Sequence, residues 1–341
     1  MNLKPLPKLE LLQALRALAA LAVVFFHTGF QPGYGEYGVN VFFVLSGVIM
    51  AMLFGAENLP GQFLQRRLIR IIPLYWAMTT VAVLLRYLTA PDSFGKLGGA
   101  YEYILSLFFV PFRARNDNIC PVLGPGWTIN YEVAFYCTCA VGLFLSRHRP
   151  ALVTASLVVF WWFCSGFSSS TAGQFYHRTI VFYFVAGIFL WHLSSVIKYR
   201  SRSLWCLILI PAICGVLAYL EFRARCQQSP YLLECLRAIL CVVVVAAALF
   251  FEPAFQRISS RIRLVLIEIG DASYALYLSH LFIINLVFVL ARKLGIGDAN
   301  LGLAVGTMIA STVVAILIHR HFDSPIQKKL RSYFRPKTIA R

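Results

Sequence analysis

The stretch LLQALRALAALAVVFFHTGF, from Leu11 to Phe30, decides the fold class of this chain. It is almost wholly apolar, and its length of about 20 residues is what an α-helix needs to cross the hydrocarbon core of a bilayer. One cation and one imidazole interrupt it, Arg16 near its start and His27 near its end. The whole chain has the same character, since 59% of its 341 residues are hydrophobic and 13% are charged. This composition is typical of a polytopic membrane protein.

Ten apolar segments are long enough to span a membrane. They cover residues 11–30, 38–56, 68–88, 129–146, 151–168, 178–197, 203–221, 232–251, 265–291 and 299–319. A shorter apolar piece, residues 103–112, is expected to be re-entrant or interfacial. The connections are mostly short, so we expect one all-α integral membrane domain over residues 1–341, a transmembrane helical bundle with no appended soluble domain.

The formal charge of +17 at pH 7 could indicate nucleic-acid binding, but the basic residues occur in short clusters between the apolar segments. Such clusters are topology signals in membrane proteins. Most of the 31 Lys and Arg residues fall on the inner side when the N-terminus is placed in the cytoplasm. We therefore expect both termini inside, no nucleic-acid partner, and a loop from about 89 to 128 on the outer side.

Arg16 and His27 lie eleven positions apart in the first apolar segment. In an α-helix this spacing brings two residues to within about 20° of the same face and separates them by about 16 Å along the axis. Arg16 is then near the inner end and His27 near the outer end, so neither has to lie at the bilayer centre. Each also has a structural interpretation, because an Arg can extend to the interface and a His can form a hydrogen bond within a bundle. The pair alone leaves both interpretations open.

Two further motifs place polar groups at the ends of predicted spans. In RRLIRIIPLYW, Arg67 and Arg70 are three positions apart and share one helix face at the inner surface. Two guanidinium groups so placed either clamp phosphates or anchor the topology. In GPGWTINYEVAFY, Trp127 is expected at interface depth and Glu132 begins the fourth span. A carboxylate that enters a span usually has a partner.

The motif GDASYALYLSH brings several polar residues into the ninth predicted span. They are Asp271, Ser273, Tyr274, Tyr277 and His280. Asp271 is either a helix cap or a charge at the inner surface, whereas His280 lies well inside the apolar run. The nine Cys residues of the chain show no zinc-like spacing, so we expect no metal site.

Five motifs, taken in order, resemble the type-three acyltransferase family of integral membrane proteins, and most closely its bacterial members associated with exopolysaccharide acylation. They are QALRALAALAVVFFH, GVNVFFVLSGVIM, RRLIRIIPLYW, GPGWTINYEVAFY and GDASYALYLSH. The resemblance covers nearly the whole chain. It implies about ten transmembrane helices in the bacterial cytoplasmic (inner) membrane. It also implies transfer of an acyl group, usually acetyl from acetyl-CoA, to a hydroxyl of an extracytoplasmic polysaccharide or lipid-linked glycan.

The resemblance also assigns positions to the family's motifs. The matching residues are Arg16 and His27 for the motif of an Arg, ten residues and a His, Arg67 and Arg70 for the paired arginines, and Trp127 and Glu132 for the Trp-to-Glu motif. The family pattern usually closes with a Glu before a Pro, whereas this sequence has Asp323 and Pro325.

The chemistry of acyl transfer favours the same residues. A base must take the hydroxyl proton of the acceptor, and a neutral His such as His27 is the usual choice near neutral pH. Coenzyme A is cytosolic and carries several phosphate charges, so it is expected at Arg67 and Arg70, with Arg16 near the same inner side. Glu132 is expected to orient an imidazole or to bind a sugar hydroxyl.

The remaining expectations concern substrate contacts and rival functions. Trp127, Tyr274 and His280 are expected to bind substrate, and the chain is expected to contact membrane lipid. A transporter or flippase is the main alternative, because intramembrane Arg, His and Glu also form proton relays and substrate paths. A structural subunit of a polysaccharide-export assembly is a third. The sequence leaves open the acceptor sugar, the acyl group, a covalent acyl-His intermediate as against direct transfer, and the oligomeric state.

Overall fold

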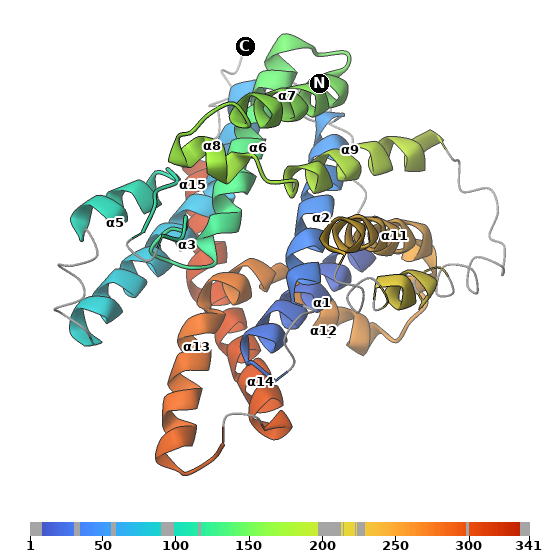
Figure 1. The fold of residues 1–341 in the computed structure, drawn as a ribbon. Helices are drawn as coiled ribbons and strands as arrows, with labels where there is room; N and C mark the ends of the chain where they lie inside the picture. Colours follow the sequence, from blue (N-terminus) through green and yellow to red (C-terminus); the bar gives the residue numbers. More distant parts are fainter. Residues whose placement is uncertain are drawn as a thin grey trace. The chain divides into compact units, whose positions relative to one another are not determined.

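The structure is a computed structural model, and it describes residues 9–30, 35–55, 59–89, 99–114, 117–196, 213, 215–221, 223, 229–297 and 300–334. The described residues form helices and connecting loops, with an isolated β-bridge between Arg113 and Ile119 (Figure 1). The predicted span 203–221 lies largely outside the described residues. The expectation of an all-α polytopic membrane protein is confirmed for the residues that are described.

Within these residues, seven stretches are long and apolar enough to cross a membrane. They are α1 (Glu10–His27), α2 (Glu36–Phe54), α3 (Pro60–Thr89), α6 (Gly126–Leu145), α11 (Pro230–Phe255), α13 (Ser273–Lys293) and the continuous run of α14 (Leu301–Ile318), η1 (His319–Asp323) and α15 (Ser324–Tyr333). The shorter helices are α5 (Ala100–Leu107), α7 (Pro150–Ser165), α8 (Thr171–Tyr176), α9 (Val181–Val196) and α12 (Ser260–Asp271). The number of spans and the side of each terminus stay predictions.

The prediction of one apolar segment over 265–291 is wrong at its N-terminal end. Two helices occupy this stretch, because α12 ends at Asp271 and α13 begins at Ser273. Ala272 between them has φ −81° and ψ −2°, which departs from helical ψ. Asp271 therefore belongs to a different helix from Tyr274 and His280.

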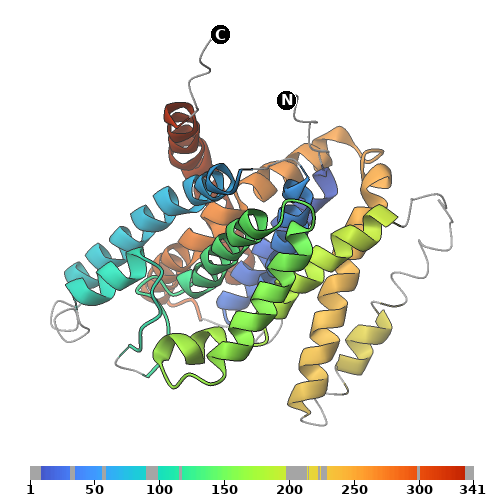
Figure 2. The same ribbon diagram turned by 90° about the horizontal axis from the view of Figure 1, so that it is seen from above.

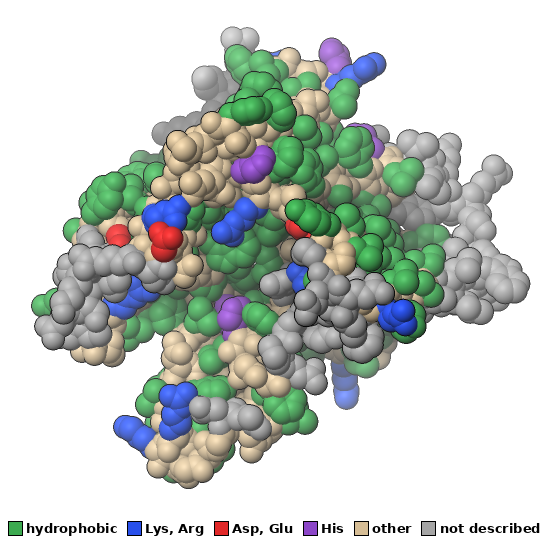
Figure 3. Space-filling view, viewed as in Figure 1, with side chains coloured by type: hydrophobic (Ala, Val, Ile, Leu, Met, Phe, Trp, Pro, Cys, Tyr) green, Lys and Arg blue, Asp and Glu red, His purple; other side chains and the backbone are tan. Residues whose placement is uncertain are grey.

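The surface of the described residues is that of a membrane protein. Figure 3 shows hydrophobic side chains spread over the visible face, with a few basic and fewer acidic groups. Large apolar residues such as Phe144, Phe160 and Leu193 are more than half exposed. A water-soluble protein rarely exposes so much contiguous apolar surface, whereas a lipid-facing surface requires it.

The helices divide into two compact units that interleave along the sequence. Unit 1 comprises residues 1–56, 179–273 and 288–308, and unit 2 comprises residues 57–178, 274–287 and 309–341. Unit 1 therefore holds α1, α2, α9, α11 and α12, and unit 2 holds α3, α5, α6, α7, α8, η1 and α15. Parts of α13 and α14 belong to each.

In unit 1, α2 and α9 pack at close range through two glycines. The Cα atoms of Gly47 and Gly187 meet so closely that a Cβ on Gly187 would lie 2.1 Å from the backbone oxygen of Val44. Beside this contact, the rings of Phe43 and Phe184 pack edge-on with centroids 4.6 Å apart. Small residues at such a crossing let two helix backbones approach, which is how helices associate without a hydrophobic driving force in lipid.

In unit 2, α3 is flanked by α5 and α6. Figures 1 and 2 both show α5 running beside α3. Tyr75 donates from its hydroxyl to the backbone oxygen of Ser106 at 3.1 Å, and Trp76 donates from Nε1 to that of Leu107 at 2.8 Å. These bonds attach the end of α5 to the middle of α3.

Candidate active site

His27 is the last residue of α1, and its ring is exposed. Its Nδ1 lies 2.8 Å from the backbone oxygen of Val23, one turn earlier. Because a carbonyl oxygen can only accept, this contact assigns the hydrogen of the neutral ring to Nδ1 and leaves the lone pair on Nε2. The Phe26 ring packs edge-on against the imidazole, with centroids 5.1 Å apart. In a neutral His27 ring, Nε2 is therefore the basic nitrogen.

A carboxylate from another helix caps the start of α1. Glu252 of α11 accepts from the backbone N–H groups of Glu10 and Leu11, both at 2.8 Å, and its side chain is buried. A negative group at this position satisfies two of the N–H groups that a helix leaves open and complements the helix dipole. Arg263 of α12 adds an ion pair, with its Nε 3.1 Å from Glu10 Oε2. The N-terminal end of α1 is thus fixed by α11 and α12.

The packing of α12 against α1 fixes the register of α1 as well. A Cβ on Gly270 would lie 2.2 Å from the backbone oxygen of Gln13, so no larger residue fits there. The side chain of Gln13 donates to Asp271 Oδ1 at 2.7 Å. Arg16 follows Gln13 by three residues and is half-buried. These contacts hold the helix that carries both Arg16 and His27.

Arg67 and Arg70 lie together on α3, in unit 2, and both are half-buried. Both are close enough to the Tyr136 hydroxyl of α6 to act on it electrostatically, and Arg67 acts on Cys139 one turn further along α6. The two arginines therefore face α6 from one side of α3, as their spacing predicts. A pair of guanidinium groups on one face can bind phosphate oxygens by charge-assisted hydrogen bonds.

Glu132 lies in the same unit and is half-buried. Its Oε1 accepts a hydrogen bond from the hydroxyl of Tyr136, four residues later on α6. The charge of Glu132 also acts on the hydroxyl groups of Tyr274 and Tyr277 of α13. The structure therefore gives Glu132 the polar partner that a carboxylate within a span requires.

Tyr274 of α13 approaches α3. Its hydroxyl donates to the backbone oxygen of Ile71 at 2.8 Å, next to Arg70 in the sequence. Asp323 also acts on this tyrosine electrostatically. One polar cluster of unit 2 thus joins residues from α3, α6, α13 and η1. Its members are Arg67, Arg70, Glu132, Tyr136, Tyr274 and Asp323.

Trp127 and His280 occupy different surroundings within unit 2. The indole of Trp127 is half-buried and packs edge-on against Tyr131, with centroids 6.0 Å apart. Tyr131 in turn stacks on Phe175 of α8 at 4.5 Å and donates to its backbone oxygen. His280 is completely buried, and its Nδ1 lies 2.7 Å from the backbone oxygen of Tyr277. The structure therefore places Trp127 in an aromatic cluster, whereas the His280 side chain is buried inside the protein.

Sequence reasoning missed two partners of these residues. Tyr136 was detectable, because it follows Glu132 at the i+4 spacing of helix neighbours. Asp323 is 2% exposed, with Oδ2 3.0 Å from His319 Nδ1 and Oδ1 accepting from Gln327 Nε2 at 2.7 Å. It lies in η1, a π-helical turn, and such turns are frequent at functional sites. Among the described residues, no group of three or more His, Cys, Asp or Glu could hold a metal.

The sequence matches the family described as Acyltransferase domain over residues 10–320. The exopolysaccharide production protein ExoZ of Rhizobium meliloti (strain 1021) is 30% identical over 338 residues, which cover 90% of this chain and 95% of ExoZ. The peptidoglycan O-acetyltransferase OatA of Listeria monocytogenes serovar 1/2a (strain ATCC BAA-679 / EGD-e) is 27% identical, over 93% of this chain and 55% of OatA. The acyltransferase MdmB of Streptomyces mycarofaciens is 23% identical, over 95% of this chain and 92% of MdmB. No solved structure matches the chain.

The matched range runs through both units and includes each site residue that the sequence motifs indicate, from Arg16 to His280. The match agrees with the resemblance that those motifs carry, and the apolar helices agree with an integral membrane protein. The chain belongs to the acyltransferase-domain family and is a multi-pass membrane acyltransferase.

Proposed function

We propose that this protein transfers an acyl group, most simply acetyl, from acyl-CoA to a hydroxyl group of a polysaccharide or lipid-linked glycan outside the bacterial inner membrane. Two names among the relatives support this class of acceptor, since ExoZ is an exopolysaccharide production protein and OatA is a peptidoglycan O-acetyltransferase. Units 1 and 2 would form a single catalytic domain, because the family match runs through both.

The observation that carries the proposal is the tautomer of His27. The contact from Nδ1 to the Val23 oxygen leaves Nε2 able to take a proton. In the reaction, Nε2 takes the proton of the acceptor hydroxyl while the hydroxyl oxygen attacks the thioester carbonyl carbon. A new C–O bond forms, the C–S bond breaks, and the sulfur of coenzyme A leaves as a thiolate. The proton on His27 then passes to that thiolate, which restores the base.

The donor would bind through its phosphates at Arg67 and Arg70. Each guanidinium presents a planar fork that matches phosphate oxygens, and both side chains come from one face of α3. The hydrogen bond between Tyr136 and Glu132 would keep both side chains of the polar cluster in a fixed orientation. Arg16, which lies on the same helix as His27, is proposed to help hold the donor. Trp127, Tyr274 and His280 are proposed to contact the substrate.

Acyl transfer is tested with the purified full-length chain in phospholipid vesicles. The donor is acetyl-CoA with a ¹³C label in the carbonyl, and the acceptor is polysaccharide isolated from cells that lack the gene. Release of coenzyme A is followed by mass spectrometry, and the ester carbonyl on the polymer is followed by NMR. We expect both products in equal amounts. Release of coenzyme A without ester would instead indicate thioester hydrolysis, and loss of neither reactant from active, folded protein would contradict the donor or the acceptor assigned here.

Competition identifies the acyl group. Unlabelled butyryl-CoA and palmitoyl-CoA are added at equal concentration to labelled acetyl-CoA in the same vesicles. We expect acetyl ester to dominate the product. A polymer that carries mainly the longer acyl group would keep the class of reaction and correct the donor.

A further inference from the structure

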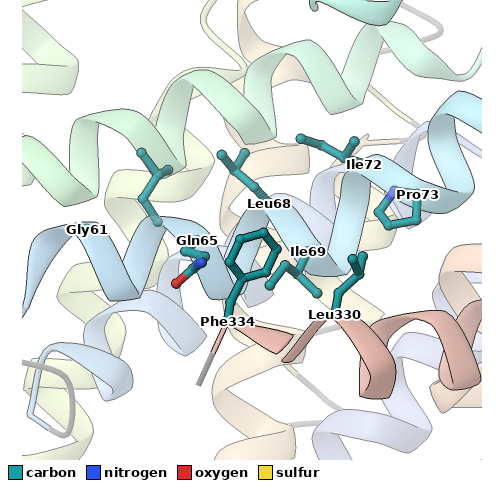
Figure 4. Close-up of a pocket in the computed structure, with 9 residues that line it drawn as sticks. Gly61, Gln65, Leu68, Ile69, Ile72, Pro73, Leu330 and Phe334 are labelled. Carbon is teal, nitrogen blue, oxygen red and sulfur yellow. The ribbon is translucent and has the colours of Figure 1, made fainter. Parts of the chain in front are cut away.

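An apolar groove lies between the first half of α3 and α15, within unit 2. Its volume is about 360 Å³. Figure 4 shows Leu330 of α15 and Phe334, which directly follows α15, beside Gln65 and Ile69 of α3. The only polar side chain among the described lining residues is that of Gln65. A cavity of this size and character suits a flexible hydrocarbon chain rather than a polar ligand.

The groove is separate from the arginine face of α3. Leu64, Leu68 and Ile72 are spaced four residues apart, so they form one stripe along the helix that lines the groove. Arg67 and Arg70 face α6, where they act on Tyr136. The groove therefore does not belong to the phosphate-binding pair proposed for the donor.

Basic residues adjoin the lining residues in the sequence, and we call these cations the border of the groove. The sequence of α15 is SPIQKKLRSY, which carries three cations and no carboxylate. Lys328, Lys329 and Arg331 are all exposed, and Leu330 between them lines the groove. On α3, Arg66 follows the lining residue Gln65 and lies about 100° around the helix from it. An apolar groove with cations next to it is complementary to a molecule that carries both a hydrocarbon chain and a negative charge.

The length of the helix places this border near the lipid headgroups. The continuous run from Leu301 to Tyr333 is 33 residues long. At 1.5 Å per residue it extends about 50 Å, whereas the hydrocarbon core is about 30 Å thick. One end must project, and α15 is the end with the cations. In the predicted topology this end faces the cytoplasm, where anionic lipids attract clusters of Lys and Arg next to a span.

We propose that the groove binds one acyl chain of an anionic phospholipid, with the lipid phosphate against the cations of α15 and Arg66. The bound chain would fill the space between α3 and α15. It would thereby stabilise a contact that already joins them, in which Gln327 of α15 donates to the backbone oxygen of Arg70 at 3.4 Å. The site is thus a structural lipid site beside the polar cluster of unit 2.

The test uses the full-length chain in lipid nanodiscs of phosphatidylcholine with palmitoyl-oleoyl-phosphatidylglycerol as the probe. Lipid that stays bound after transfer to detergent is counted by native mass spectrometry. We expect about one phosphatidylglycerol per chain and at least a fivefold preference over phosphatidylcholine. Binding of the two lipids in proportion to their abundance would overturn the proposal.

Two variants separate the groove from its border. Leu68→Trp fills the groove and should lower retained phosphatidylglycerol at least fivefold, whereas Leu84→Trp, at an exposed position of the same helix, should not. The triple change of Lys328, Lys329 and Arg331 to Gln should abolish the preference for the anionic lipid. Equal loss in the matched control, in which the exposed Arg147, Arg149 and Arg257 are changed to Gln, would show a non-specific charge effect and overturn the site.

Other occupants give different results in the same assay. Deletion of residues 335–341 should leave the amount of retained phosphatidylglycerol unchanged. A rise in retained lipid relative to the unaltered chain would show that this segment, and not a lipid, fills the groove. Dissociation of a wild-type dimer by Leu68→Trp would assign the groove to a second copy of the chain. Either result overturns the proposal. The assay requires no donor or acceptor, so its outcome is independent of the proposed acyl transfer.

Discussion

Tyr136 donates a hydrogen bond from its hydroxyl to Oε1 of Glu132, one turn earlier on α6. Arg67 and Arg70 of α3 act on the same hydroxyl electrostatically. The Tyr136 hydroxyl therefore interacts with the carboxylate and with the two guanidinium groups of unit 2. This position assigns it a role in holding Glu132, because a carboxylate with one fixed hydrogen bond loses the freedom to turn toward another partner.

Tyr136→Phe should lower turnover about tenfold or more, since a hydrogen bond to a charged group contributes about 1.5 to 3 kcal/mol. Glu132→Gln should lower turnover as well. If the pair acts as a unit, the double variant should be no slower than the slower single variant. The measurement is acetyl transfer at saturating donor, normalised to membrane abundance. Tyr101→Phe, at an exposed position of α5, is the control. Fully additive losses would show that the two residues act independently.

The arginine pair should affect the donor more than the chemical step. Arg67→Ala or Arg70→Ala should raise the KM for acetyl-CoA about tenfold or more, with a smaller change in kcat, because each charge-assisted contact is worth about 1.5 to 3 kcal/mol. Lys at either position should restore binding in part, having lost the planar fork. Arg86→Ala on the same helix, which is exposed, should leave KM unchanged. An unaltered KM in both arginine variants would make the pair a topology anchor.

The crossing of α2 and α9 should be sensitive to a single methyl group. Gly187→Ala places a Cβ 2.1 Å from the backbone oxygen of Val44, so the two helices must separate. Overpacking of this kind costs about 1 to 3 kcal/mol, and we expect a lower thermal midpoint of the purified protein. Gly306→Ala is the control, because a Cβ there meets nothing within 4 Å. A midpoint equal to that of the control would mean that the crossing relaxes without cost.

The positions of the apolar helices were predictable because apolar length is a local property of the sequence. The predicted span 11–30 corresponds to Glu10–His27, and 129–146 corresponds to Gly126–Leu145. The start of α3 at Pro60, well before the predicted 68, was not apparent, since polar residues extend this helix beyond the apolar part that hydropathy detects. The break at Ala272 was not apparent either, since hydropathy does not report a single residue that leaves the helical conformation.

The candidate site was predictable where residue type and spacing sufficed. Arg67 and Arg70 share a helix face by spacing alone, and Glu132 was indicated by a carboxylate at the start of a span. The burial of Asp323 could not be predicted, since it depends on the π-helical turn and on the packing of that turn against α3. The hydrogen bond that sets the His27 tautomer is local, but a sequence does not specify the ring orientation that makes it.

The loop from about 89 to 128 is predicted to lie outside the cytoplasm, where it could reach the acceptor. Asn116→Cys, in a background without other reactive thiols, should be labelled in intact cells by a thiol reagent that cannot cross the membrane. Residue 116 lies outside the described residues, so the prediction rests on the positive-inside count. A second Cys in place of Arg149, predicted to be cytoplasmic, should be labelled only after lysis. The reverse pattern would invert the topology and, with it, the side from which the acceptor arrives.

The role of His27 is the most direct test of the chemistry. The Nδ1 contact with Val23 leaves Nε2 to take the acceptor proton, so His27→Ala should remove a group that acts mainly in the transition state. Turnover should fall about a hundredfold or more, which is the usual scale of general base catalysis. Binding of acetyl-CoA, measured separately by equilibrium titration, should change little, and membrane abundance should stay the same. His27→Gln should be equally slow, because an amide can accept a hydrogen bond but cannot take up the proton.

A histidine control distinguishes this loss from a general effect of removing an imidazole. His148→Ala changes an exposed residue in the connection between α6 and α7, and it should keep full turnover. If His27→Ala retained wild-type turnover at normal abundance, the hydrogen bond to Val23 would be a structural contact at the end of α1, and the base would have to be sought among other groups. If instead it lost donor binding together with turnover, His27 would bind the donor rather than take the acceptor proton. Only a large loss of turnover with donor binding preserved agrees with the mechanism proposed for this site.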